Sequence, residues 1–153
     1  MPSLTPPPLD SSSCEEDPSA AVPSRVVLQK LPFLVLSYET KQGWLYADWL
    51  GTQTAATLQA GTEVIQEAVG TGLYCKLLND NTHMTALEVE RQDWPDPHGL
   101  MPLFQAGLHC LAWVYSPSPQ GRAFTDFYVT HSSWPLVLSF EECEVAAEWL
   151  RSC

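Results

Sequence analysis

Two short apolar segments, residues 73–78 and 110–115, constrain the fold of this chain more than any other feature. Their apolar residues are neighbours in the sequence and do not alternate cleanly with polar ones. Such continuity is typical of central strands in a parallel sheet, because helices cover both faces of these strands. Parallel strands are joined by crossover connections that are usually helical, so the two segments predict an α/β protein.

Further strands are expected on either side of this parallel unit. Residues 33–39 and 43–49 are rich in aromatic and branched side chains, which favour a pleated, half-buried surface. The short Gly-containing link between them predicts a β-hairpin. Residues 135–138 predict a last short strand.

A first crossover helix is expected between the hairpin and residues 73–78. Thr52 or Thr54 can cap its start, and apolar residues recur at helical spacing along one face. Gly70 and Gly72 predict its end, because glycine is favoured just after the last turn of a helix.

Further helical segments complete the pattern. Residues 85–88 and 139–142 both fit a capping box, in which Ser or Thr precedes Glu by three positions, so each predicts a helix start. A short helix is expected around residues 102–106 and a longer one from Gly121. The predicted order is therefore β-β-α-β-α-β-α-β-α: a mixed sheet with an N-terminal hairpin, then parallel strands with right-handed crossover helices.

The N-terminal segment differs in composition from the rest of the chain. Residues 1–24 hold six of the 13 prolines, three consecutive serines and three consecutive acidic residues. Too few large apolar side chains are present to offset the entropy of ordering, so we predict a disordered tail. Residues 25–153 are expected to form one domain.

The charge of the chain excludes two classes of partner. Acidic residues number 18 against 7 basic residues, and residues 26–153 alone hold 14 against 6. Such a surface repels phosphate backbones and anionic lipids, so we expect no nucleic-acid or membrane-surface role. No segment approaches the roughly 18–20 apolar residues of a membrane-spanning helix. The N-terminus also lacks the pattern of a secretory signal, and we expect a cytoplasmic protein.

The cysteines agree with that location. They are odd in number and no pair has C-x-x-C spacing, so we expect reduced thiols that behave as small hydrophobic side chains. The five positions are Cys14, Cys75, Cys110, Cys143 and Cys153.

Known catalytic and metal-binding motifs are absent from the sequence. It contains no G-x-S-x-G, no G-x-G-x-x-G and no H-E-x-x-H. Asp80 and His83 could form an acid/base pair only if the intervening loop curls back. We therefore expect a non-enzymatic protein without a cofactor or a metal site.

Polar residues concentrate where two of the expected parallel strands end. The carboxyl ends of adjacent parallel strands meet at one edge of a sheet, where helix N-termini also favour anions. A binding surface for a protein partner or an anionic ligand is one interpretation, and capping or turn residues without a partner are the other. The candidate residues are Asn79, Asp80, Asn81, Thr82 and His83 after the first strand, with Ser116, Ser118 and Arg122 after the second.

Three segments give the chain a resemblance to a known family. They are residues 76–81 (KLLNDN), residues 111–115 (LAWVY) and residues 140–150 (FEECEVAAEWL). With the hairpin start and the short last strand, this pattern resembles the STAS domain. That family includes the anti-sigma-factor antagonists and small bacterial STAS/Sec14-like proteins. The resemblance covers residues 33–151.

The resemblance implies two further expectations. Antagonists of this family carry a phosphorylatable Ser or Thr just after an Asp at the end of the third strand. Asp80 matches that acidic residue and Thr82 is the nearest hydroxyl, although the family's Asp-Ser-Ser-Gly or Asp-Ser-Thr-Gly sequence is absent. The resemblance thus implies a regulatory domain that binds a protein partner, with Thr82 as a possible phosphosite. The Sec14-like branch implies the alternative, a carrier or sensor with an apolar small-molecule or lipid pocket between helices and sheet.

Overall fold

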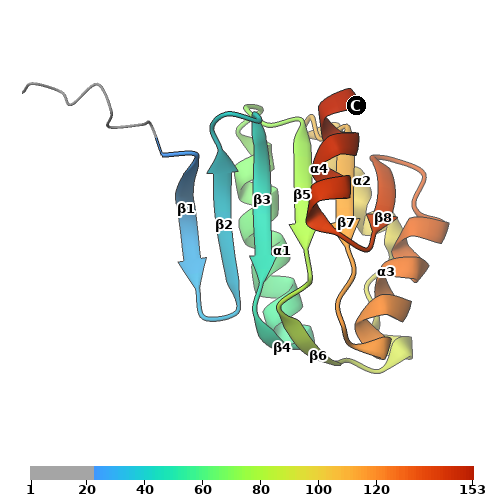
Figure 1. The fold of residues 1–153 in the computed structure, drawn as a ribbon. Helices are drawn as coiled ribbons and strands as arrows, with labels where there is room; N and C mark the ends of the chain where they lie inside the picture. Colours follow the sequence, from blue (N-terminus) through green and yellow to red (C-terminus); the bar gives the residue numbers. More distant parts are fainter. Residues whose placement is uncertain (1–22) are drawn as a thin grey trace, which may run out of the picture.

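The structure is a computed structural model that describes residues 23–153, so the predicted tail lies outside the described residues except for Pro23 and Ser24. Its centre is a six-stranded sheet with the strand order β1-β2-β3-β5-β7-β8 (Figure 1). The strands are β1 (Arg25–Leu31), β2 (Leu34–Glu39), β3 (Trp44–Trp49), β5 (Lys76–Asp80), β7 (Cys110–Val114) and β8 (Leu136–Phe140).

The direction of the strands confirms the predicted hairpin and the predicted parallel unit. β2 and β3 pair antiparallel, while β3, β5, β7 and β8 pair parallel in that order. β1 adds an antiparallel edge strand that the sequence analysis did not predict. Its first six residues are all exposed, so the sequence carries no burial pattern that would have marked it as a strand.

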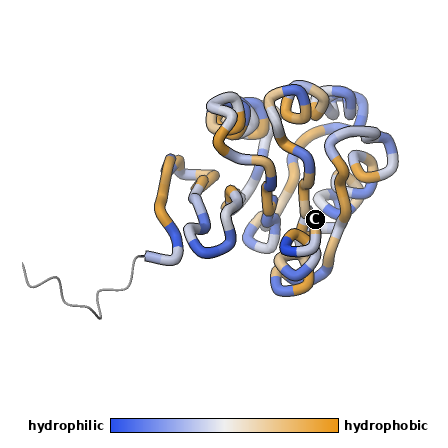
Figure 2. The backbone as a smooth tube through the Cα atoms, turned by 90° about the horizontal axis from the view of Figure 1, so that it is seen from above, coloured by the Kyte–Doolittle hydropathy of each residue, from blue (hydrophilic) through white to orange (hydrophobic). Residues whose placement is uncertain are grey.

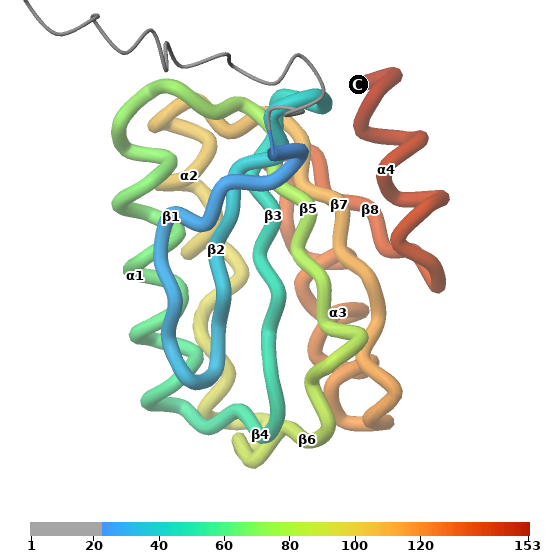
Figure 3. The backbone as a smooth tube through the Cα atoms, turned by 60° about the vertical axis from the view of Figure 1, so that its left-hand side comes forward, coloured from blue at the N-terminus to red at the C-terminus, as the bar shows by residue number. Residues whose placement is uncertain are grey.

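Helices lie on both faces of the sheet (Figures 2 and 3). One face carries α1 (Ala55–Gly70), α2 (Met101–Gln105) and α3 (Pro119–His131), and α4 (Cys143–Ser152) lies on the other. Two short 3-10 helices, η1 (Arg91–Asp93) and η2 (Pro97–Leu100), precede α2. None of the helices in residues 23–153 is long and apolar enough to span a membrane.

Side-chain alternation along the central strands builds two separate cores. In β3, Leu45 and Ala47 belong to the core under α1 and α3, whereas Trp44 and Tyr46 belong to the core under α4. All five residues of β7 are buried, as expected for a strand covered on both faces. The continuous apolar run of residues 110–115 thus correctly predicted a strand that is buried on both faces.

The first helix begins where the sequence indicates. Thr54 is the N-cap of α1, and the side chains of Thr54 and Thr57 each accept a hydrogen bond from the other's backbone N–H. Gly61 lies where α1 crosses the sheet: a Cβ atom there would overlap the ring of Trp49. A residue without a side chain is needed for this close approach.

Both of the other predicted capping boxes are wrong. Residues 85–88 lie in β6 (Met84–Glu88), which pairs parallel with β4 (Gly51–Thr54) in a second, two-stranded sheet. This pairing across some thirty residues of sequence outweighs the local helix signal. Ser139 lies within β8, where its hydroxyl is 2.9 Å from that of Tyr115, and α4 begins at Cys143 without a side-chain cap.

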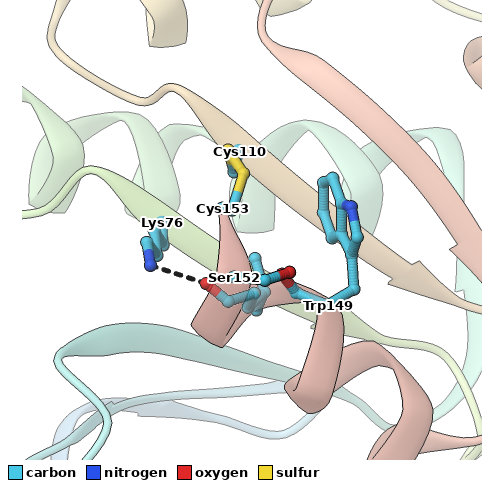
Figure 4. Close-up of a disulfide and its surroundings, with 6 residues drawn as sticks. Lys76, Cys110, Trp149, Ser152 and Cys153 are labelled. Atoms are coloured by element: carbon cyan, nitrogen blue, oxygen red, sulfur yellow. Dashed lines mark hydrogen bonds between the residues drawn. A yellow bond between two sulfur atoms is a disulfide. The ribbon is translucent and has the colours of Figure 1, made fainter.

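Two cysteines correct the expectation of reduced thiols. Cys110 at the start of β7 and Cys153 after α4 form a disulfide (Figure 4). The packing of α4 across β7 brings these residues together, and their 43-residue separation in the sequence hides the pairing. Cys75 is free and exposed. It lies outside β5, which begins at Lys76 and not at residue 73 as predicted. Cys143 is free and half-buried.

The contact between Gly61 and Trp49 gives a matched pair of variants in α1. Gly61→Ala should lower the free energy of unfolding by about 1–3 kcal/mol, because the new methyl group overpacks the core. Gly70→Ala, at the open end of the same helix, has nothing within 4 Å of its new Cβ atom and should be neutral or slightly stabilising. Urea denaturation of the two variants measures both effects, and an equal change in both would contradict the packing described here.

Candidate functional site

The polar run after β5 is divided between the two faces of the sheet. Successive residues of a strand point to opposite faces, so Leu78 and Asp80 lie toward α4 while Leu77, Asn79 and Asn81 lie toward α1 and α3. The sequence analysis placed Asn79, Asp80 and Asn81 in one surface. The structure instead distributes them over two buried environments.

On the α4 side, Asp80 is the centre of a hydrogen-bonded cluster. Its carboxylate is 1% exposed and accepts hydrogen bonds from the Tyr46 hydroxyl and from the backbone N–H of Thr82 (2.9 Å). Burial alone would raise the pKa of Asp80, but the bonds from Tyr46, Thr82 and Cys143 outweigh it and lower the pKa below its usual value. Burial together with the negative charge of Asp80 raises the pKa of Cys143 to about 12, so this thiol stays protonated.

A second carboxylate lies close to this cluster. Asp48 Oδ1 accepts a hydrogen bond from His83 Nδ1 at 2.8 Å, and this bond raises the pKa of the exposed imidazole. One ligand atom each from Asp48, Asp80 and His83 lie within 4.8 Å of one another. Within residues 23–153 this is the group that could hold a metal ion, although Asp80 already accepts several hydrogen bonds from the protein.

Thr82 lies against the same carboxylates. It is half-buried, and its backbone N–H donates to Asp80 Oδ1 at 2.9 Å. A phosphoryl group on Thr82 would therefore meet the negative charge of Asp80, with His83 as a neighbouring cation once it is protonated. Phosphorylation of Thr82 stays a prediction.

The candidates after β7 hold local structure together. Ser116 is buried and donates to the carbonyl of Met84 at 2.6 Å, which joins the end of β7 to the start of β6. Ser118 is the N-cap of α3. Arg122 pairs with Glu141 at 3.0 Å and lies over the ring of Tyr115, so it is engaged away from the polar run after β5. A role of these residues in binding a partner stays a prediction.

The face toward α1 and α3 contains a cavity that the sequence analysis did not locate. Its volume is about 510 Å³, and its mouth lies between α1 and the segment of residues 89–100. Apolar side chains from the sheet and the helices form most of its wall. They include Trp49, Leu58, Ile65, Leu77, Leu103, Leu111, Trp113 and Phe124.

Three residues with polar side-chain atoms belong to this lining: Asn79 on β5, Asn81 just beyond its end, and Trp113 on β7. Asn79 Oδ1 accepts a hydrogen bond from Trp49 Nε1 at 2.7 Å. Asn81 Oδ1 and Trp113 Nε1 are buried and have no hydrogen-bond partner among the described residues. Buried polar atoms are nearly always paired, and these two unpaired atoms are also closed off from the space of the cavity.

The segment that borders the mouth is fastened to α3. Trp94 packs edge-on against Phe124 and Phe127 and donates to the Val89 carbonyl at 3.2 Å. The Tyr128 hydroxyl donates to the carbonyl of Pro95, and burial raises the pKa of this phenol. These bonds give the mouth a fixed rim.

One signal in the sequence could have located the cavity. Asn79 and Asn81 are two positions apart, so in a strand they point to the same face as the apolar Leu77. Two carboxamides on the buried face of a central strand are unusual, because amide groups are costly to bury without partners. The lining contributed by α1, α2 and α3 depends on tertiary packing and has no such local signal.

The buried Asp80 predicts a pH dependence that Tyr46→Phe should reveal. Asp80 has a lowered pKa when folded, so it stabilises the protein above its unfolded pKa of about 3.8, and this stability is lost as pH falls through the folded pKa. Without the Tyr46 hydroxyl the folded pKa rises. The variant should therefore lose about 1–3 kcal/mol near neutral pH, and this loss should shrink below about pH 4.

Urea denaturation across the pH range measures this difference. Tyr115→Phe is the matched control, since it removes a hydroxyl that bonds to the exposed Asp126. Its smaller effect should vary less with pH. A loss in Tyr46→Phe that does not change between neutral and acid pH would contradict the role assigned to Asp80.

Comparisons with known proteins identify the fold. No protein-family model matches the sequence, and no curated protein matches it either. A solved structure does match: an uncharacterised protein of the DUF3478 family from Shewanella loihica PV-4, described as having a SpoIIAA-like fold. The match covers 80% of this chain and 97% of that one, with a TM-score of 0.53 and 17% identity. The expected resemblance is thus confirmed at the level of architecture: this chain has the SpoIIAA-like, or STAS, fold.

Proposed function

We propose that this STAS-like protein is a non-enzymatic carrier or sensor that holds a small apolar molecule between its sheet and helices α1, α2 and α3. The observation that carries the proposal is the cavity of about 510 Å³. This volume lies within the range of small-molecule sites, which are mostly apolar and contain a few placed polar groups. Thr62, Asn79 and Asn81 are polar residues of the lining here.

The cost of an open cavity supports the same proposal. Protein interiors are close-packed and contain few voids larger than a water molecule. Unfilled space in a core lowers stability roughly in proportion to its volume, and a ligand that fills it restores contacts and stabilises the folded state. A cavity of this size is therefore more easily explained as a binding site than as a packing defect.

The regulatory role implied by the family resemblance is a separate proposal. It would use the exposed His83 and the half-buried Thr82 at the end of β5, together with Arg122. Asp80, Ser116 and Ser118 make internal hydrogen bonds and are at most 9% exposed, which leaves little of the predicted surface available to a partner. The cavity is the better supported of the two sites.

A neutral fluorescent probe tests the cavity. N-phenyl-naphthylamine fluoresces strongly in apolar surroundings, and we expect it to bind with a dissociation constant on the order of 1–10 μM. Leu103→Phe should weaken this binding at least about tenfold, because the larger side chain fills the cavity from α2. Leu138→Phe is the matched control: it makes the same change at an exposed position of β8 outside the cavity.

Melting curves show whether each variant folds, and Ile65→Phe provides a second way to fill the cavity from α1. Binding that survives both cavity variants, or a wild-type protein that does not bind the probe, would overturn the proposal.

A further inference from the structure

The charges around the opening of the cavity define its ligand more narrowly. The geometry points to a cationic amphiphile: an apolar chain or ring that enters the cavity, joined to an amine or ammonium group that stays at the mouth. This inference rests on the proposed function. An anionic amphiphile, such as a fatty acid or a phosphate-bearing lipid, fits the same site poorly.

The exposed part of the cavity lining is acidic. Lining residues from the six-stranded sheet, α2 and α3 are buried, whereas the exposed ones come from α1 and from residues 93–99. Glu63 lies on the α1 side of the mouth, and Asp93 and Asp96 lie on the opposite side. No lysine, arginine or histidine occurs among the lining residues of the described chain. The opening therefore carries negative charge on both of its sides.

No cation of the described chain neutralises these carboxylates. None of the three forms an ion pair within residues 23–153. Glu63 Oε1 accepts a hydrogen bond from Gln59 Nε2 at 3.3 Å, and Asp96 Oδ1 accepts one from the backbone N–H of His98 at 2.9 Å. Both donors are uncharged groups, so the negative charge of the mouth is left to attract a cation from solution.

The charge of Asp96 also acts on the wall of the cavity. Tyr128 belongs to this wall, and burial together with the negative charge of Asp96 raises the pKa of its phenol. Arg91 precedes the acidic residues of the same segment but is not part of the lining, and it lies over the rings of Trp94 and Phe127. A positive group at the mouth is therefore attracted, and a negative one is repelled.

The apolar wall and the acidic mouth place the two parts of such a ligand. A charged group is costly to bury among apolar side chains, so the ammonium stays at the opening while the apolar part fills the space behind it. An ammonium group offers only donors, and carboxylates offer only acceptors. Gln59 and Gln66 of α1 add carboxamide oxygens to the lining on the same side as Glu63.

Three competitors with chains of nearly equal length separate charge from apolar burial. Nonylamine is positively charged at neutral pH because its pKa is close to that of lysine, nonanol is neutral, and nonanoate is negatively charged. At about 0.1 M salt, nonylamine should displace N-phenyl-naphthylamine at a concentration at least about fivefold lower than nonanol, and nonanoate should be the weakest. At about 1 M salt this preference should fall below about twofold, because exposed charges are then screened.

Variants assign the preference to the mouth. Glu63→Gln and Asp93→Asn together remove one charge from each side and should reduce the advantage of nonylamine over nonanol to less than about twofold, with the affinity for nonanol unchanged. Glu144→Gln and Glu148→Gln together are the matched control. They make the same change in net charge at exposed positions of α4, on the opposite face of the sheet, and should keep the preference. Melting curves show that each variant folds.

The outcomes distinguish this inference from the proposed function. If the probe binds but nonylamine displaces it no better than nonanol, the cationic inference is wrong and the apolar cavity stands. The same holds if the mouth variant keeps the preference, if the α4 variant loses it equally, or if methylammonium, which lacks the apolar chain, displaces the probe. If neither the probe nor any competitor binds, and none raises the melting temperature, the proposed function itself fails.

Discussion

The parallel pairing of β3, β5 and β7 is the constraint on which the rest of this structure depends. These strands are covered on both faces, so each side chain belongs to one of two cores that never meet. A single step along a strand moves a residue from one core to the other. Asp80 and Asn81 are neighbours in the sequence, yet one is the centre of a charged cluster under α4 and the other borders an apolar cavity.

That separation lets one short segment meet two opposite physical requirements. On the α4 side, the buried carboxylate of Asp80 is supplied with donors from Tyr46, Thr82 and Cys143, as a buried charge requires. On the other side, Asn81 and Trp113 keep polar atoms unpaired in an apolar environment. The first arrangement stabilises the folded chain, whereas the second lowers its stability, because a buried polar atom without a partner is costly.

Much of the architecture could be predicted from local patterns. The hairpin of β2 and β3, the buried strand β7, the start of α1 at Thr54 and the STAS-like topology follow from periodicity and turn chemistry. The β4–β6 pair, the Cys110–Cys153 disulfide and the set of residues that line the cavity could not be predicted locally, because they depend on residues far apart in the sequence. β1 was missed for another reason: it lacks an alternating burial pattern. The candidate site residues were placed at the correct strand ends, and the capping interpretation holds for Ser118, the N-cap of α3. The burial of Asn79, Asp80 and Asn81 was not predicted, because it depends on tertiary contacts.

The disulfide between Cys110 and Cys153 contributes to the stability of the whole fold. It ties the last residue of the chain to β7 on the α4 face, where Lys76 Nζ also donates to the Leu150 carbonyl at 2.6 Å (Figure 4). Closing a loop of 43 residues stabilises a fold by about 4 kcal/mol in the chain-entropy view. Because this entropy is lost from the unfolded chain, a reductant would lower the stability of the whole fold, including the layer that shapes the cavity. The disulfide and the cavity lie on opposite faces of the sheet, yet both are built on β7, which carries Cys110 on one face and Leu111 and Trp113 on the other.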